Sequence, residues 1–128
     1  MRPRVGVFRS WALPMSETFI QNQLAATRRY DPHLICIRRL DDGLQVPSMA
    51  AATTRLVARC ITEFGYSRTI AHEMSMADIV HVHFASDAAV ILPSILRSPR
   101  PFVATCQGFD FCAGLYFWPK ITVWLGQV

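Results

Sequence analysis

Apolar residues in this chain gather in short runs, and these runs alternate with stretches whose apolar positions repeat at helical spacing. Four runs, over residues 4–8, 34–37, 79–83 and 102–105, are brief and nearly continuous. Such runs are typical of strands that are covered on both faces of a parallel sheet. The alternation therefore predicts an α/β protein with a Rossmann-like parallel sheet and helices on both faces.

The first stretch with helical spacing follows the first strand and carries an N-terminal signal. Ser16 suits the N-cap, where its hydroxyl accepts a hydrogen bond from a free backbone N–H, and Glu17 suits the positive end of the helix dipole. The residues Tyr30-Asp31-Pro32 end the helix, because the residue before a proline is pushed out of the α region. The side chains expected to face the core are Phe19, Ile20, Leu24 and Thr27.

Two further helices are expected in the middle of the chain, after a turn at Asp41-Asp42-Gly43 and a loop that continues to Ala52. The first spans 53–64 and is followed by Gly65, which suits a C-terminal cap. The second spans about 67–76. Helical spacing predicts their inward-facing residues, which are Leu56, Val57, Cys60, Ile61 and Phe64 in the first and Ile70, Met74 and Ala77 in the second.

A last helix, over 88–96, is expected after the strand at 79–83. Ser86 or Asp87 suits its N-cap. Pro93 is expected to kink or shorten it, because proline lacks a backbone N–H and its ring clashes with the preceding turn.

Length and composition favour one globular domain, since the chain has 128 residues, of which 52% are hydrophobic and 17% are charged. The formal net charge is +4, with the arginines scattered in short pairs. This is either an ordinary solvated surface or a surface for an anionic partner, such as a sugar nucleotide, a lipid phosphate or an acidic membrane face. Nucleic acid is not expected as a partner, because basic and aromatic residues do not interleave along a stripe.

Targeting signals are few. The basic residues 1–4 are not followed by the apolar stretch of a signal peptide, and the four cysteines form no C-x-x-C pair and no zinc-like spacing. Both observations indicate a cytoplasmic protein. The apolar run 111–128 is interrupted by Pro119 and Lys120, so each piece is too short to span a bilayer. The run is expected to supply core or interface, with peripheral contact at the inner face of the membrane as the alternative.

His81 and His83 are two positions apart in a strand, so both imidazoles are expected on the same face. They could be two packed histidines, or part of a metal site, although the sequence offers no convincing third ligand. In a third interpretation, a histidine at the strand tip hydrogen-bonds a sugar or phosphate oxygen. His83 is then the stronger candidate, because ligands of open α/β sheets bind beyond the carboxyl ends of the strands.

Two other strands are also followed by candidate binding residues. In the run 105–110, Gly108 lets a ligand approach the backbone closely, and Gln107 and Asp110 offer hydrogen-bonding groups. The same run could equally be a tight turn in which Asp110 bonds its own backbone. The loop 10–16 precedes a helix N-terminus with free N–H groups, although it lacks a G-x-G-x-x-G pattern.

Three segments share their pattern and order with one known family. They are Ser-Glu-Thr-Phe-Ile at 16–20, Ala-Asp-Ile-Val-His-Val-His-Phe at 77–84, and Thr-Cys-Gln-Gly-Phe-Asp at 105–110. Together they resemble the N-terminal domain of the family 4 retaining glycosyltransferases, in the branch that builds exopolysaccharide and colanic-acid-type chains. That branch has a Ser-Glu-Thr-Phe-Ile signature, an Ala-Asp-x-x-His-x-His-Phe strand and a Thr-x-His-Gly-x-Asp loop.

The resemblance implies that residues 1–128 form the acceptor-side, N-terminal half of a GT-B fold, truncated before the domain that binds the nucleotide sugar. Its partners would be a lipid-linked or polysaccharide sugar acceptor and a nucleotide-sugar donor, with no metal and no further cofactor. A separate donor domain or a second copy of the chain could complete the enzyme. Alone, the chain is expected to be inactive or nearly so, because transfer needs groups positioned against both substrates.

By the same resemblance, Ser16, Glu17 and Thr18 line the floor of a cleft. His83 and the loop of Gln107, Gly108 and Asp110 would face the donor sugar. Gln107 stands where the family has a histidine. Its amide can hydrogen-bond a hydroxyl but cannot become a cation near neutral pH, so a proton-handling role is not expected there.

Two other classes of function fit the same sequence. A truncated domain could act as a non-enzymatic protein-interaction module, with its cleft side as an apolar interface. A flavodoxin-like binding domain has less support, because the chain lacks the acidic cluster of a phospho-receiver and the hydroxyl-rich phosphate loop of a flavodoxin.

Overall fold

Five parallel strands form one sheet in the computed structural model of the chain, which describes residues 1–11, 17–38, 42, 46, 48–51 and 54–105. The strands are β1 (Arg4–Trp11), β2 (Asp31–Arg38), β3 (Met49–Ala51), β4 (Ile79–Val82) and β5 (Phe102–Ala104). Their order in the sheet is β3-β2-β1-β4-β5. The central strand is β1, whose Val7 pairs with Leu34 of β2 and with His81 of β4.

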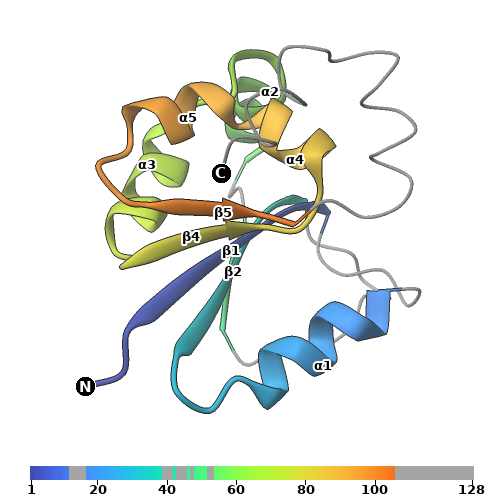
Figure 1. Cartoon of the computed structure of the whole chain (residues 1–128). Coiled ribbons are helices and arrows are strands. Elements are labelled where there is room, and N and C mark those ends of the chain that lie inside the picture. Colours follow the sequence, from blue (N-terminus) through green and yellow to red (C-terminus); the bar gives the residue numbers. More distant parts are fainter. Residues whose placement is uncertain (12–16, 39–41, 43–45, 47, 52–53, 106–128) are drawn as a thin grey trace.

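Helices cover both faces of the sheet (Figure 1). On one face lies α1 (Thr18–Ala26), and on the other lie α2 (Arg55–Phe64), α3 (Arg68–Ser75), α4 (Ala85–Val90) and α5 (Leu92–Arg97). Successive side chains of a strand point to opposite faces. Val7 therefore packs with Ile20 of α1, whereas Phe8 packs in the larger core with Ile61 of α2. This arrangement confirms the Rossmann-like α/β fold predicted from the apolar runs.

The short strand β3 lies in a stretch that the sequence predicted to be loop. That prediction is wrong, because Leu34, Ile35 and Cys36 pair in register with Met49, Ala50 and Ala51. Methionine and alanine have little intrinsic preference for strands. The backbone hydrogen bonds offered by β2 therefore decide the conformation here, and they do so through partners distant in sequence.

The predicted helix ends agree with the structure in the middle of the chain. Gly65 follows α2 in the left-handed conformation, with φ of 64°, and Ser67 caps α3 by accepting a hydrogen bond from the Ile70 N–H. The N-terminus of α4 differs, because Phe84 holds the N-cap position and Asp87 lies within the helix. Neither Ser86 nor Asp87 is therefore the cap that was expected.

The core-facing residues of the helices are only partly those predicted. Ile61, Ile70, Met74 and Ala77 are buried as expected, but Leu56 and Phe64 are exposed. In α1, Ile20 and Leu24 are buried, whereas Phe19 is not. Helical spacing identifies an apolar stripe, but the line along which a helix crosses the sheet selects which part of that stripe is covered.

The helix expected over 88–96 is interrupted as Pro93 predicted. Ile91 separates α4 from α5, and the proline lies in the first turn of α5, where its missing N–H costs no intrahelical hydrogen bond. The buried Ser94 hydroxyl then donates a hydrogen bond to the Gly65 carbonyl, which joins α5 to the end of α2.

A buried histidine links strand β2 to helix α3 and to the segment just before β3. His33 of β2 is 8% exposed, and its Nε2 lies 2.9 Å from a carboxylate oxygen of Glu73 in α3. Its Nδ1 is hydrogen-bonded to Ser48, just before β3. Both ring nitrogens are therefore partnered, and the residue is explained by structure alone.

No helix in the described part of the chain is both long enough and apolar enough to cross a membrane. The apolar run 111–128, for which core or peripheral membrane contact was expected, lies outside the described residues.

Candidate functional site

At the neighbouring strands β1 and β4, the chain leaves the sheet toward opposite faces. After β1 the chain passes to α1 on one face, and after the adjacent β4 it passes to α4 on the other (Figure 1). The carboxyl ends of such a strand pair form the crevice in which open α/β sheets bind their ligands. The residues that end β1 and follow β4 are therefore the candidates for a binding site.

A partly buried arginine occupies this position. Arg9, near the end of β1, has a side chain that is only 11% exposed and forms ion pairs with Glu17 and Asp87. Its Nε donates a hydrogen bond of 3.0 Å to Glu17, and its Nη1 donates to Asp87. The two carboxylates are also buried, with side chains 12% and 7% exposed. One cation thus joins β1 to the beginning of α1 and to the first turn of α4.

The environment of Arg9 keeps it charged. Burial acts to lower its pKa, but hydrogen bonding and attraction from Glu17 and Asp87 outweigh that effect, so the pKa is raised above its ordinary value. The Asp87 carboxylate has two further donors in Ser10, from the hydroxyl at 2.7 Å and the backbone N–H at 3.2 Å. This network accounts for two carboxylates that would otherwise be costly to bury.

Aromatic contacts bring two of the family-like segments together at the same place. The Arg9 guanidinium lies 4.3 Å from the ring centre of Phe84, a cation–π contact. Phe19 makes an edge-on contact with the His83 ring, at 6.4 Å between centroids. Residues 17–19 and 83–84 therefore form one cluster, although more than 60 residues separate them in the sequence.

His83 follows β4 as predicted, but its side chain is not open to the crevice. The residue is 2% exposed, and its Nδ1 is buried without a hydrogen-bond partner. Burial, with smaller contributions from the charges of His81 and Arg9, lowers its pKa to about 4. His83 is consequently a neutral imidazole at physiological pH, covered on one side by Phe19.

His81 lies on the same face as His83, as the period of a strand predicts. The two ring centroids are 4.3 Å apart. The His81 Nε2 is 2.8 Å from the Thr105 hydroxyl, just after β5, and burial lowers the pKa of His81. In the described parts of the chain, no group of three metal-binding side chains is placed to hold a metal ion.

Three of the seven predicted site residues belong to this cluster or adjoin it. Glu17 and His83 lie in the cluster, and Thr18 is an exposed residue at the start of α1. Glu17, not Ser16, holds the N-cap position of α1, and its side chain binds Arg9 instead of capping the helix. The other four lie outside the described residues: Ser16, Gln107, Gly108 and Asp110.

Sequence reasoning missed the roles of Arg9 and Asp87, and it included Ser10 only as the first residue of the candidate loop 10–16. A signal was available for the first, because an arginine directly after the apolar run 4–8 of a central strand needs a buried counter-charge. Nothing local indicates that the counter-charge is Asp87, which lies 78 positions further along the chain.

Comparison of the chain with protein-family models, curated proteins and solved structures finds no significant match.

Proposed function

We propose that this chain is the acceptor-side domain of a glycosyltransferase of the GT-B type, which works with a second domain that binds the nucleotide sugar. The proposal has two sources. One is the resemblance of three segments to the family 4 retaining enzymes, and the other is the site at the carboxyl ends of β1 and β4.

The observation that carries the proposal is the contact between two of those segments. Glu17 binds Arg9, which lies against Phe84, and Phe19 lies against His83. If the resemblance of these segments to the family were accidental, their residues would not be expected to lie in contact. Here they meet at the strand pair where open α/β sheets bind ligands.

The arrangement suits recognition of hydroxyl groups. Glu17 and Asp87 balance the charge of Arg9. These ion pairs hold the beginnings of α1 and α4 against the end of β1. The exposed Thr18 follows directly on this rigid support. The Thr18 hydroxyl can both donate and accept hydrogen bonds, which suits the hydroxyl groups of a sugar. Because the backbone beside it is already fixed, less conformational entropy is lost when a ligand binds.

His83 would act in this site as a positioning residue. Its neutral ring supports Phe19 and through it the first turn of α1. No direct contact between His83 and the acceptor sugar is proposed, because the residue is 2% exposed.

The proposed acceptor is a sugar on a lipid or polysaccharide, handled in the cytoplasm or at the inner face of the membrane. The net charge of +4 favours an acceptor whose carrier is anionic, such as a lipid phosphate. Exposed arginines at positions 2, 28, 29 and 100 contribute to that charge. Vesicles containing anionic lipid should bind the chain more strongly than neutral vesicles, and the difference should vanish at high salt.

Calorimetry with a short prenyl diphosphate that carries one hexose tests the acceptor assignment. We expect Thr18→Ala to weaken binding about tenfold, the loss of one well-placed hydrogen bond. The control Thr62→Ala changes an exposed threonine in α2 and should bind like the wild type. Failure of the wild type to bind any glycosylated carrier, or equal affinity in both variants, would refute the assignment.

A transfer assay tests the need for a second domain. The pure 128-residue chain should move no hexose from any nucleotide sugar, because donor binding is assigned to the other domain. Turnover by the chain alone would show that this division of roles is wrong.

A further inference from the structure

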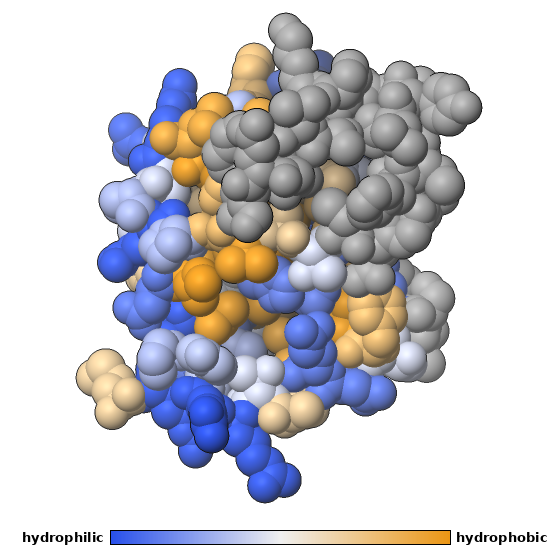
Figure 2. Space-filling model, viewed as in Figure 1, coloured by the Kyte–Doolittle hydropathy of each residue, from blue (hydrophilic) through white to orange (hydrophobic). Residues whose placement is uncertain are grey.

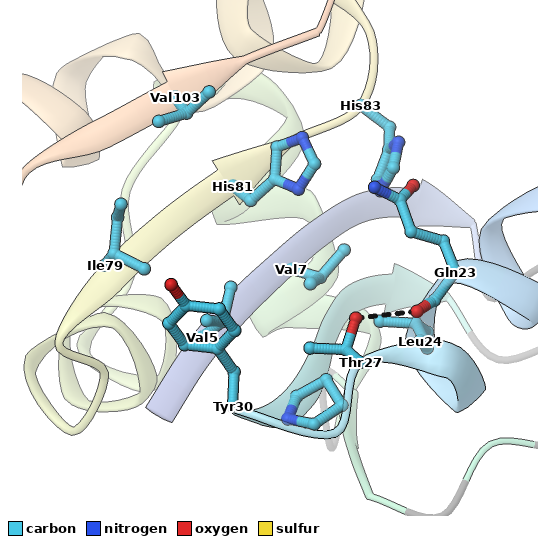
Figure 3. A pocket seen from close by; sticks show the side chains of 11 residues that line it. Val5, Val7, Gln23, Leu24, Thr27, Tyr30, Ile79, His81, His83 and Val103 are labelled. Carbon is cyan, nitrogen blue, oxygen red and sulfur yellow. Dashed lines mark hydrogen bonds between the residues drawn. The ribbon is translucent and has the colours of Figure 1, made fainter. Parts of the chain in front are cut away.

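A cavity lies between α1 and the sheet, next to the cluster at the end of β1 but on the side of α1 that faces the strands (Figure 3). Its volume is about 290 Å³. Strands β1, β4 and β5 supply one wall, and α1 with the following turn supplies the other. The lining residues that carry the argument are Val7, Gln23, Tyr30, His81, His83 and Val103.

The chemistry of the lining is apolar with a few uncharged polar groups. Val5, Val7, Leu24, Ile79 and Val103 are among the apolar side chains, and none of the described residues that line the cavity is an aspartate, glutamate, lysine or arginine. A charged ligand would lose its hydration here without gaining a counter-charge. Figure 2 shows hydrophobic side chains gathered in the middle of this side of the molecule, bordered by hydrophilic ones. The site therefore favours a neutral, mainly apolar molecule.

Among the described residues of the lining, one buried polar atom lacks a hydrogen-bond partner. His83 is 2% exposed, and its Nδ1 has no hydrogen bond. Figure 3 shows its ring at one end of the group of lining side chains. By contrast, His81 is partnered by Thr105, and the Thr27 hydroxyl donates to the Gln23 carbonyl at 2.7 Å. Buried polar atoms of native proteins are nearly always hydrogen-bonded, so an orphan in a cavity wall marks a place for a ligand atom.

We propose that this cavity binds a small neutral amphiphile, an aromatic or isoprenoid alcohol, whose hydroxyl pairs with the His83 imidazole. The size agrees with this class. A buried apolar cavity of about 150 Å³ accommodates benzene, so roughly twice that volume accommodates about twelve non-hydrogen atoms. The neutral imidazole has one donor and one acceptor nitrogen, so a hydroxyl can pair with it in either tautomer.

The inference is separate from the sugar-acceptor proposal. The sugar site is assigned to the crevice beside Thr18, whereas the cavity lies between α1 and the sheet, with Tyr30 and Val103 among its lining residues. His83 belongs to both proposals, so they are told apart by residues that only one of them uses: Thr18→Ala should weaken only sugar binding, and Val103→Trp should weaken only binding in the cavity.

The test uses two probes of matched shape, 4-tert-butylphenol and 4-tert-butyltoluene, titrated into the full chain and followed by calorimetry and by backbone amide shifts. The wild type should bind the phenol about tenfold more tightly than the toluene, the effect of one hydrogen bond to a buried acceptor. His83→Phe keeps the ring and removes both nitrogens. In that variant the preference should fall to about one, with the toluene still bound.

A blocking variant tests the location. Val103 lies at the rim and is 48% exposed, so Val103→Trp should obstruct the opening and weaken both probes at least about tenfold. Leu96→Trp places the same side chain on exposed α5, on the other face of the sheet, and should leave binding unchanged. Absence of binding by the wild type, equal affinity for both probes, or full binding by the Val103→Trp variant would each overturn the proposal.

Discussion

Replacing Arg9 with methionine removes the cation that joins β1, α1 and α4 while keeping a long apolar side chain. It leaves Glu17 and Asp87 as two buried carboxylates without their counter-charge, and their side chains are only 12% and 7% exposed. Removing one partner of a buried ion pair costs about 3–5 kcal/mol of unfolding free energy. Since a domain of this kind has about 5–15 kcal/mol in total, the variant should be severely destabilised.

Chemical denaturation in urea, with circular dichroism as the signal, measures this effect. For a domain of 128 residues, a loss of about 3–5 kcal/mol in unfolding free energy corresponds to a fall in melting temperature of about 12–20 °C. The matched control is Arg59→Met, which breaks an ion pair with Glu63 on the exposed surface of α2, where Arg59 is 75% exposed. That change should alter stability by about 0.5 kcal/mol or less.

A double variant separates the ion pair from side-chain packing. Glu17→Gln removes one of the two carboxylates, so in the Arg9→Met background it should cost less than in the wild type. The coupling free energy should exceed about 1 kcal/mol. An Arg9→Met protein as stable as the Arg59→Met control, or strictly additive losses in the double variant, would refute the role given to Arg9.

The remaining predictions concern a glycine and a histidine. Gly65→Ala should cost about 2–5 kcal/mol, because φ is +64° and the new Cβ would lie 2.3 Å from the Val90 carbonyl oxygen. Gly6→Ala places its Cβ 3.2 Å from side-chain atoms of Ala77 and Ile35 and 3.9 Å from the Ile79 carbonyl oxygen, so it should cost less than Gly65→Ala in the same urea experiment. An NMR titration should give His83 a pKa of about 4. Since the unfolded imidazole holds its proton up to about pH 6.5, stability should rise between pH 4 and about pH 6.5. A midpoint near 6.5 in the folded protein would contradict the burial of this ring.

The architecture was predictable because it depends on local patterns. The apolar runs that end at Phe8 and begin at Leu34 and Ile79 are strands, and their continuous character identifies a sheet covered on both faces. Gly65 and Ser67 end one helix and begin the next for reasons that lie within a few residues of each.

The site was only partly predictable, because its bonds join distant segments. His83 was singled out from its place at a strand end, and Glu17 from the family resemblance. That Glu17 would bind Arg9, and that Asp87 would bind it from the other side, depends on the strand order. β3 was missed for the same reason, since its pairing with β2 overrides weak local preference.

We propose that the carboxyl ends of β1 and β4 form a sugar-acceptor site. The most direct measurement is a ¹H–¹⁵N correlation spectrum of the 128-residue chain during titration with a hexose-carrying prenyl diphosphate. The account predicts saturable shifts of the amides of Ser10, Thr18 and Phe84, with those of α3 unmoved. Shifts confined to α2 and α3, or no saturable shift at all, would contradict it.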